Sequence, residues 1–155
     1  MTEALVEAWL VNNRVNLMIL RELGDEALAA SLSSRGGRTV GEQLAHVLEV
    51  RRAKVEAADK ALAATIPTVG REQGHDREAL LAGFEKSGEA VAELIRKSAG
   101  EGGQVKGFRR GIVVLIAYLI AHDAHHRGHL FLTLKQSKVG IPASLRMEIW
   151  AWNQI

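Results

Sequence analysis

The sequence predicts an all-α protein, built as a four-helix bundle with a short C-terminal helix. Ala, Leu, Glu, Lys and Arg, which favour helices, are abundant along the whole chain. Only two prolines occur, Pro67 and Pro142, and both lie between segments whose apolar residues recur at helical spacing. The 155 residues suffice for one core, so we expect a single domain over residues 1–155.

Four long amphipathic segments make up most of the chain, and glycine- or proline-containing stretches separate them. The predicted helices span about residues 3–23, 25–31, 39–64, 76–100, 109–136 and 144–152. Thr39 and Glu42 fit a capping box, and Asp76 fits an N-cap. A break is expected at Arg35–Gly37, and a short extended piece near residues 104–108. The connections between the long helices are long for a bundle, so the order of up and down helices stays open.

The composition excludes several classes of function. The chain has no cysteine, which rules out disulfides, zinc–thiolate sites, iron–sulfur clusters and a cysteine nucleophile. A net charge of +2 and an aromatic content of 5% argue against nucleic acid as a partner. The longest apolar run, Ile112–Ala121, is too short to cross a membrane. The N-terminus does not resemble a signal peptide, so we expect a cytoplasmic protein by default.

A cluster of histidines marks the end of the longest predicted helix, where four of the six histidines fall within eight residues. His122 and His126 lie one turn apart on one face, and His129 lies within an arc of about 60° of them. The same face carries Leu115 and Leu119, so the imidazoles continue an apolar seam. Neighbouring imidazoles repel one another when protonated and leave lone pairs unpaired when neutral. A divalent metal bound to neutral rings would resolve both problems.

Two histidines one turn apart give only two ligands, and a stable site needs a third from another helix. His75 is predicted in a loop beside Gly74, where it would be solvated. His46 lies inside a predicted helix, at the border between its alanine-rich face and its charged edge. It can reach an internal site from there, although the periodicity does not force it inward. The alternative, histidines on the surface or in the core without a metal, stays open.

The motifs together resemble the DinB/YfiT-like superfamily of metal-dependent enzymes over nearly the whole chain. The matching pieces are Trp9 with Asn13-Arg14, the segment 39–46 (TVGEQLAH), the segment 122–128 (HDAHHRG) and the aromatic ending 149–152 (IWAW). The H-x-x-x-H-R-G block is the most specific of these when an upstream histidine accompanies it.

The resemblance implies an up-down-down-up four-helix bundle that is often a homodimer. It also implies a divalent metal, zinc or nickel, bound by His46, His122 and His126, with water or a small-molecule substrate at the open positions. Members with assigned activities include hydrolases, isomerases and transferases that use a low-molecular-weight thiol. His129 departs from the family, where Gln is common. It is a candidate fourth ligand, hydrogen-bonding partner or substrate contact, and whether His125 binds metal also stays open.

Three histidine ligands leave an open coordination position, as catalytic metal sites do. The metal can lower the pKa of bound water toward about 7, which leads to hydrolysis, or hold a thiol as its thiolate. Because the chain lacks cysteine, that thiol would arrive as a cosubstrate. Both routes need a base, and Glu49, one turn after His46, is the candidate. A solvated helix acid is the alternative interpretation of Glu49.

A noncatalytic protein is the competing hypothesis. Closure of the site by His129 as a fourth ligand would favour a structural metal, in a stress-related dimer that binds a metal or a small ligand. A histidine pH switch without metal is a third possibility, which the apolar seam disfavours.

Three further features receive structural interpretations. Asp123 points about 100° away from the ligand face, so we expect it to support a ligand or to pair with Arg127. Gly128 lies in the middle of a helix, which suggests a close contact with another helix or a ligand. Arg51-Arg52 is expected to be a basic pair on a helix surface.

At the C-terminus, Ser144 is expected to cap the terminal helix. Trp150 and Trp152 are expected to pack this helix onto the bundle, or to wall a pocket or a dimer interface.

Overall fold

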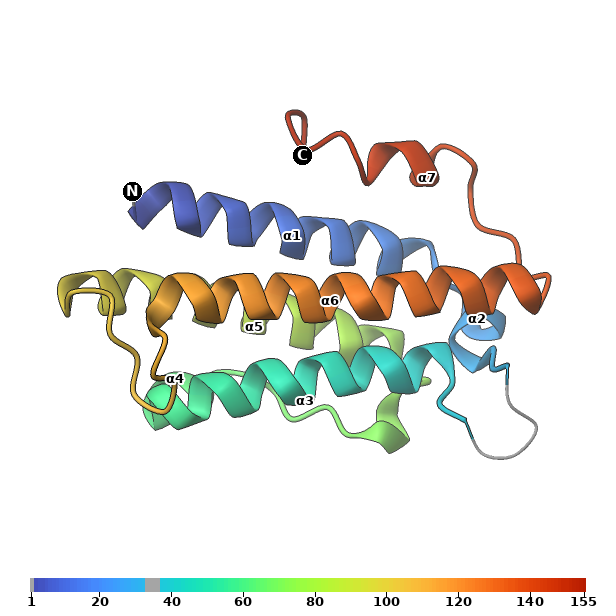
Figure 1. Ribbon diagram of the computed structural model, residues 1–155. Helices are drawn as coiled ribbons and strands as arrows, with labels where there is room; N and C mark the ends of the chain where they lie inside the picture. Colours follow the sequence, from blue (N-terminus) through green and yellow to red (C-terminus); the bar gives the residue numbers. More distant parts are fainter. Residues whose placement is uncertain (1, 33–36) are drawn as a thin grey trace.

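The computed structural model describes residues 2–32 and 37–155, and within them the regular structure is helical (Figure 1). The elements are α1 (Thr2–Glu22), α2 (Asp25–Ala29), α3 (Val40–Ala58), α4 (Lys60–Ala63), the 3₁₀ helix η1 (Arg71–Gln73), α5 (Arg77–Gly100), α6 (Gly111–Gln136) and α7 (Leu145–Glu148). The extended piece expected near residues 104–108 is an isolated bridge between Val105 and Phe108. The break expected at Arg35–Gly37 falls largely on residues 33–36, which lie outside the described residues.

The four long helices form the bundle, and this confirms the predicted fold class. Helices α1 and α6 run in one direction, and α3 and α5 run in the other, which is the up-down-down-up order (Figure 1). Around the bundle, α1 packs on α5, α5 on α3, α3 on α6, and α6 on α1. Helices α3 and α6 are therefore antiparallel neighbours.

The helix starts follow the predicted caps, but one predicted helix is broken. The Thr39 hydroxyl accepts from the backbone N–H of Glu42, and the Glu42 carboxylate accepts from the N–H of Thr39. The helix that begins there was expected to continue to Ala64 and instead ends at Ala58. Asp59 adopts an extended backbone, and its carboxylate accepts from the N–H of Leu62, so it starts a new short helix.

The predicted extent and cap of the C-terminal helix were wrong. Helix α7 covers only Leu145–Glu148, and Ser144 makes no side-chain cap. Leu145 and Ile149 are buried against the bundle, whereas Trp150 and Trp152 line a pocket beside it, which is the second role expected for them. Trp150 is 75% exposed and lies beyond the helix.

A buried polar layer divides the core into two apolar clusters. One cluster holds Trp9, Val55 and Leu119, and the other holds Leu20, Leu48 and Leu130. The polar layer between them draws side chains from all four long helices: Asn12, Asn13, Asn16, Arg51, Ser87 and Asp123.

An ion pair between Arg51 of α3 and Asp123 of α6 is the centre of this layer, and both side chains are fully buried. Asp123 Oδ2 also accepts hydrogen bonds from Asn12 Nδ2 (2.7 Å) and Asn16 Nδ2 (2.9 Å) of α1. The expected partner of Asp123 was Arg127. No ion pair joins these two described residues, and Arg127 instead donates to the side-chain oxygens of Asn12 and Asn16.

The guanidinium of Arg51 is satisfied on every side. It donates to Asn13 Oδ1 (2.7 Å) and to the Ser87 hydroxyl (3.0 Å), besides Asp123. The rings of Trp9 and Phe84 flank it, with centroids 4.6 Å and 4.8 Å away. The expectation of a surface basic pair at Arg51-Arg52 is therefore wrong for Arg51. Arg52 is partly exposed and pairs with Glu56.

Two helix-interior glycines differ in their surroundings. A Cβ added to Gly88 of α5 would lie 2.2 Å from Asn13 Nδ2, and the Gly88 carbonyl accepts a hydrogen bond from the Trp9 indole (2.9 Å). A Cβ added to Gly128 of α6 would meet nothing within 4 Å. Of the two explanations offered for Gly128, a close contact with another helix or with a ligand, the first finds no support among the described residues, and a close helix contact occurs instead at Gly88.

We predict that Asp123→Ala lowers the free energy of unfolding by about 3–5 kcal/mol, because it leaves the Arg51 charge buried without a counter-charge. The matched control is Glu56→Ala, which removes the partner of the exposed Arg52 and should change stability by less than about 0.5 kcal/mol. Urea unfolding followed by circular dichroism measures both. Equal losses of stability in the two variants would show that the buried ion pair stabilises the fold no more than the exposed one does.

We predict opposite signs for alanine at the two glycines. Gly88→Ala should destabilise the protein by about 1–2 kcal/mol, since the methyl group overpacks against Asn13. Gly128→Ala should stabilise it by about 0.5–1 kcal/mol, since alanine is the better helix former and the space is open. Thermal unfolding of both variants tests this, and a gain in stability at Gly88 would contradict it.

Candidate metal centre

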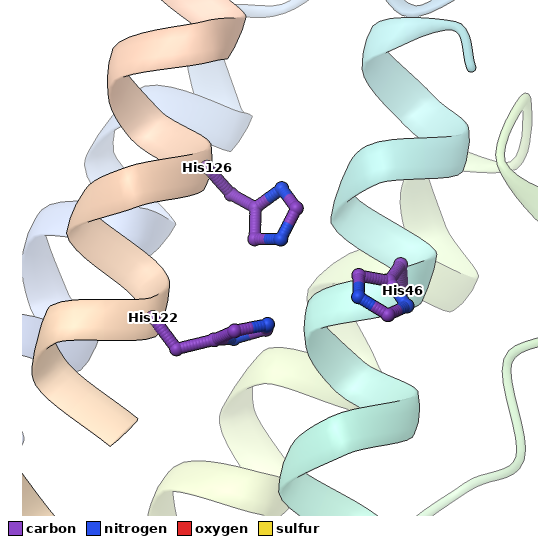
Figure 2. Close-up of side chains that lie close together, drawn as sticks. All are labelled: His46, His122 and His126. Carbon is purple, nitrogen blue, oxygen red and sulfur yellow. The ribbon is translucent and has the colours of Figure 1, made fainter. Parts of the chain in front are cut away.

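Three histidines converge between α3 and α6 (Figure 2). His122 and His126 lie one turn apart on α6, and His46 of α3 points toward them across the gap between the two helices. One ring nitrogen of each histidine can be chosen so that all three lie within 4.8 Å of one another. The structure thus brings together the three residues that the sequence offered as metal ligands.

The three rings are close without being stacked. Their centroids are 4.7 Å apart for His122 and His126, 5.1 Å for His46 and His126, and 5.5 Å for His46 and His122. The planes are inclined at 59–70°, so the rings face a shared point from different directions. All three side chains are partly exposed, so the site opens to solvent.

Burial disfavours the charged form of two imidazoles in the group, those of His122 and His126. Desolvation, aided by the neighbouring histidines, lowers the pKa of His126 from 6.5 to about 4. Desolvation also lowers the pKa of His122, although the charge of Asp123 acts in the opposite direction. Both rings are therefore neutral at pH 7, which is the form that binds metals.

The hydrogen bonding of these rings is incomplete in a way that suits a metal. The Nδ1 atoms of His122 and His126 are buried, and neither has a hydrogen-bonding partner among the described residues. Buried polar atoms are nearly always satisfied, so two such nitrogens in adjacent rings need an explanation. A divalent cation coordinated by neutral imidazoles fits this donor set.

Glu49 lies at the rim of the site, as its spacing from His46 predicts. Its Oε2 is 3.7 Å from His46 Nδ1, and its side chain is 53% exposed. The carboxylate is thus next to the histidines, at a distance too long for a hydrogen bond. It can contact a molecule that approaches from solvent.

Sequence analysis missed Tyr118, which lies beside the site. Its ring is nearly parallel to that of His122, at 24°, with centroids 6.0 Å apart. Lys54 of α3 lies 5.3 Å from the centre of the tyrosine ring. The sequence could have indicated Tyr118, because it precedes His122 by four residues and therefore shares its face of the helix.

The other histidines lie outside the group of three. His129 is exposed, and its ring centroid is 6.3 Å from that of His126. Its nearer neighbour is His125, at 4.2 Å, on the solvent side of α6. His75 is an exposed turn residue, as expected from its loop sequence.

One family of known proteins matches this chain. Across the described residues, no helix is both long and apolar enough to span a membrane. Searches of curated proteins and of solved structures gave no significant match. A family model described as "DinB family" matches residues 1–140, a range that includes α1 to α6 and all three converging histidines. The chain belongs to the DinB family.

Proposed function

We propose that this protein is a metal-dependent enzyme in which His46, His122 and His126 hold one divalent cation and a small-molecule substrate binds beside it. The observation that carries the proposal is the convergence of three ring nitrogens within 4.8 Å, from two helices. Zinc and nickel both suit histidine ligands, and these are the metals that the family resemblance implies.

The number of ligands favours a catalytic role over a structural one. The group of potential ligands found among the described residues has three members, and His129 is not one of them. Structural zinc sites are closed by four protein ligands, whereas catalytic sites keep a position for water or substrate. The partial exposure of the three rings is consistent with such access.

The cation and the side chains around it would have different roles in the reaction. When bound, the cation would act as a Lewis acid that lowers the pKa of a coordinated water or thiol. Glu49, at the rim, would accept the proton that is released. Tyr118 of α6, which lies beside His122, and Lys54 of α3, which lies beside Tyr118, would line the approach to the site and orient the substrate. These roles support either hydrolysis or the transfer of a thiol to an electrophile, with the thiol supplied as a low-molecular-weight cosubstrate.

We predict that the protein purified without a histidine tag carries about one zinc or nickel ion per chain, and that His126→Ala loses it. His129→Ala is the matched control and should keep the metal. Elemental analysis gives the occupancy, and circular dichroism verifies that each variant is folded. Full metal content in a folded His126→Ala variant would overturn the assignment of the ligands.

We predict that Glu49→Gln keeps the metal and lowers kcat/KM by about 10²–10⁴-fold, the usual contribution of a general base. Glu56→Gln, another exposed acid on α3, should leave kcat/KM unchanged. The assays compare ester and amide hydrolysis with the reaction of a low-molecular-weight thiol and an electrophile, each with metal-loaded protein. A metal-loaded protein that is inactive in both would instead favour the noncatalytic hypothesis.

A further inference from the structure

A second concave site lies on the far side of α6 from the histidines. It is a cavity of about 520 Å³ lined by residues of α6, α1 and the C-terminal segment that contains α7. Figure 1 shows where these three segments lie in the fold. On α6 it is lined by Ala124, Gly128 and Phe131, which project roughly opposite to His122 and His126. The cavity is thus separate from the candidate metal centre.

Most of the residues that line this cavity are apolar. Val15 of α1 faces Ile141, Ile149 and Trp150 of the C-terminal segment. Trp150 is 75% exposed although it borders an apolar hollow. The volume lies within the range of about 300–1,000 Å³ that is typical of pockets for small organic ligands.

The charged residues of the cavity all have the same sign. Arg127, Lys135 and Arg146 line it, and no acidic residue does. None of the three forms an ion pair with a carboxylate anywhere in residues 2–32 or 37–155. Arg127 donates hydrogen bonds to the neutral amides of Asn12 and Asn16. Three cations that have no ion-pair partner among the described residues, beside an apolar hollow, complement an anion with an apolar body.

The charges also argue against a second copy of the chain as the occupant. A two-fold symmetric interface brings the same patch of each subunit together, so the three cations of one copy would lie near the three cations of the other. Like charges placed opposite one another disfavour such an interface. A small anion would experience attraction from the same residues.

We propose that the cavity between α6, α1 and the C-terminal segment binds an amphipathic monoanion. Its acidic head group would lie by Arg127, Lys135 and Arg146, and its apolar chain or ring would lie against Phe131, Ile149 and Trp150. Gly128 has a functional explanation on this basis, because the absence of a side chain there keeps the floor of the cavity open.

The test uses decanoate as the probe and the whole chain, with isothermal titration calorimetry as the measurement. Decanoate should bind saturably at about one molecule per chain, and the uncharged decanol should bind at least about tenfold more weakly. The double variant Lys135→Gln/Arg146→Gln should weaken decanoate binding about tenfold, since both side chains are exposed cations. Lys106→Gln, which removes an exposed cation from another part of the chain, is the matched control and should change nothing.

Blocking variants test the location. Gly128→Leu and Ala124→Leu each place a side chain on the cavity floor, so each should abolish decanoate binding without loss of thermal stability. His126→Ala should bind decanoate normally, which separates this proposal from that of the metal centre. Equal affinity for decanoate and decanol, no saturable binding, or full binding by Gly128→Leu would each overturn the proposal. So would light scattering that shows a dimer which Gly128→Leu dissociates, because a second copy would then occupy the cavity.

Discussion

The buried ion pair between Arg51 and Asp123 joins the same two helices that carry the converging histidines. Asp123 is the neighbour of His122 in sequence, and Arg51 follows His46 by five residues. A shift of α3 along α6 by one helical turn, about 5.4 Å, would separate the charges and the imidazoles together. Such a shift would take the Arg51 guanidinium away from Asp123, Asn13 and Ser87 and leave two opposite charges buried apart from each other. This is far more costly than the loss of apolar contacts alone. The polar layer therefore fixes the register on which the histidine geometry depends.

Much of the fold could be predicted from the sequence because it is encoded locally. The cap formed by Thr39 and Glu42 and the one-turn spacing of His122 and His126 involve residues close in sequence, and both occur as predicted. The position of His46 is different. Its helix periodicity left it at a border, so the sequence offered it as a candidate third ligand, and the family resemblance then selected it.

The polar layer was missed although its signal was present. Arg51 was treated as half of a basic pair, yet it lies three residues after Leu48 and four before Val55, on the same buried stripe of α3. A charge on an apolar stripe predicts a buried partner, but its identity depends on the packing of four helices. Asp59 is a case in which a local signal was misjudged. Helix propensity is high on both sides of it, yet the helix ends there, and the Asp59 carboxylate accepts a hydrogen bond from the N–H of Leu62 that caps a new helix.

Helix α6 presents two chemically distinct surfaces, and the polar layer lies between them. Arg127 borders the apolar cavity and donates to Asn12 and Asn16, and these amides donate in turn to Asp123. A chain of contacts alone does not couple two sites, because coupling requires an element with two alternative arrangements. The Asp123 carboxylate is held from α1 and α3 at once, and its partner Arg51 is enclosed by two aromatic rings. A layer so fully bonded favours a single arrangement, so it should insulate the histidines from events in the cavity while holding both surfaces in place.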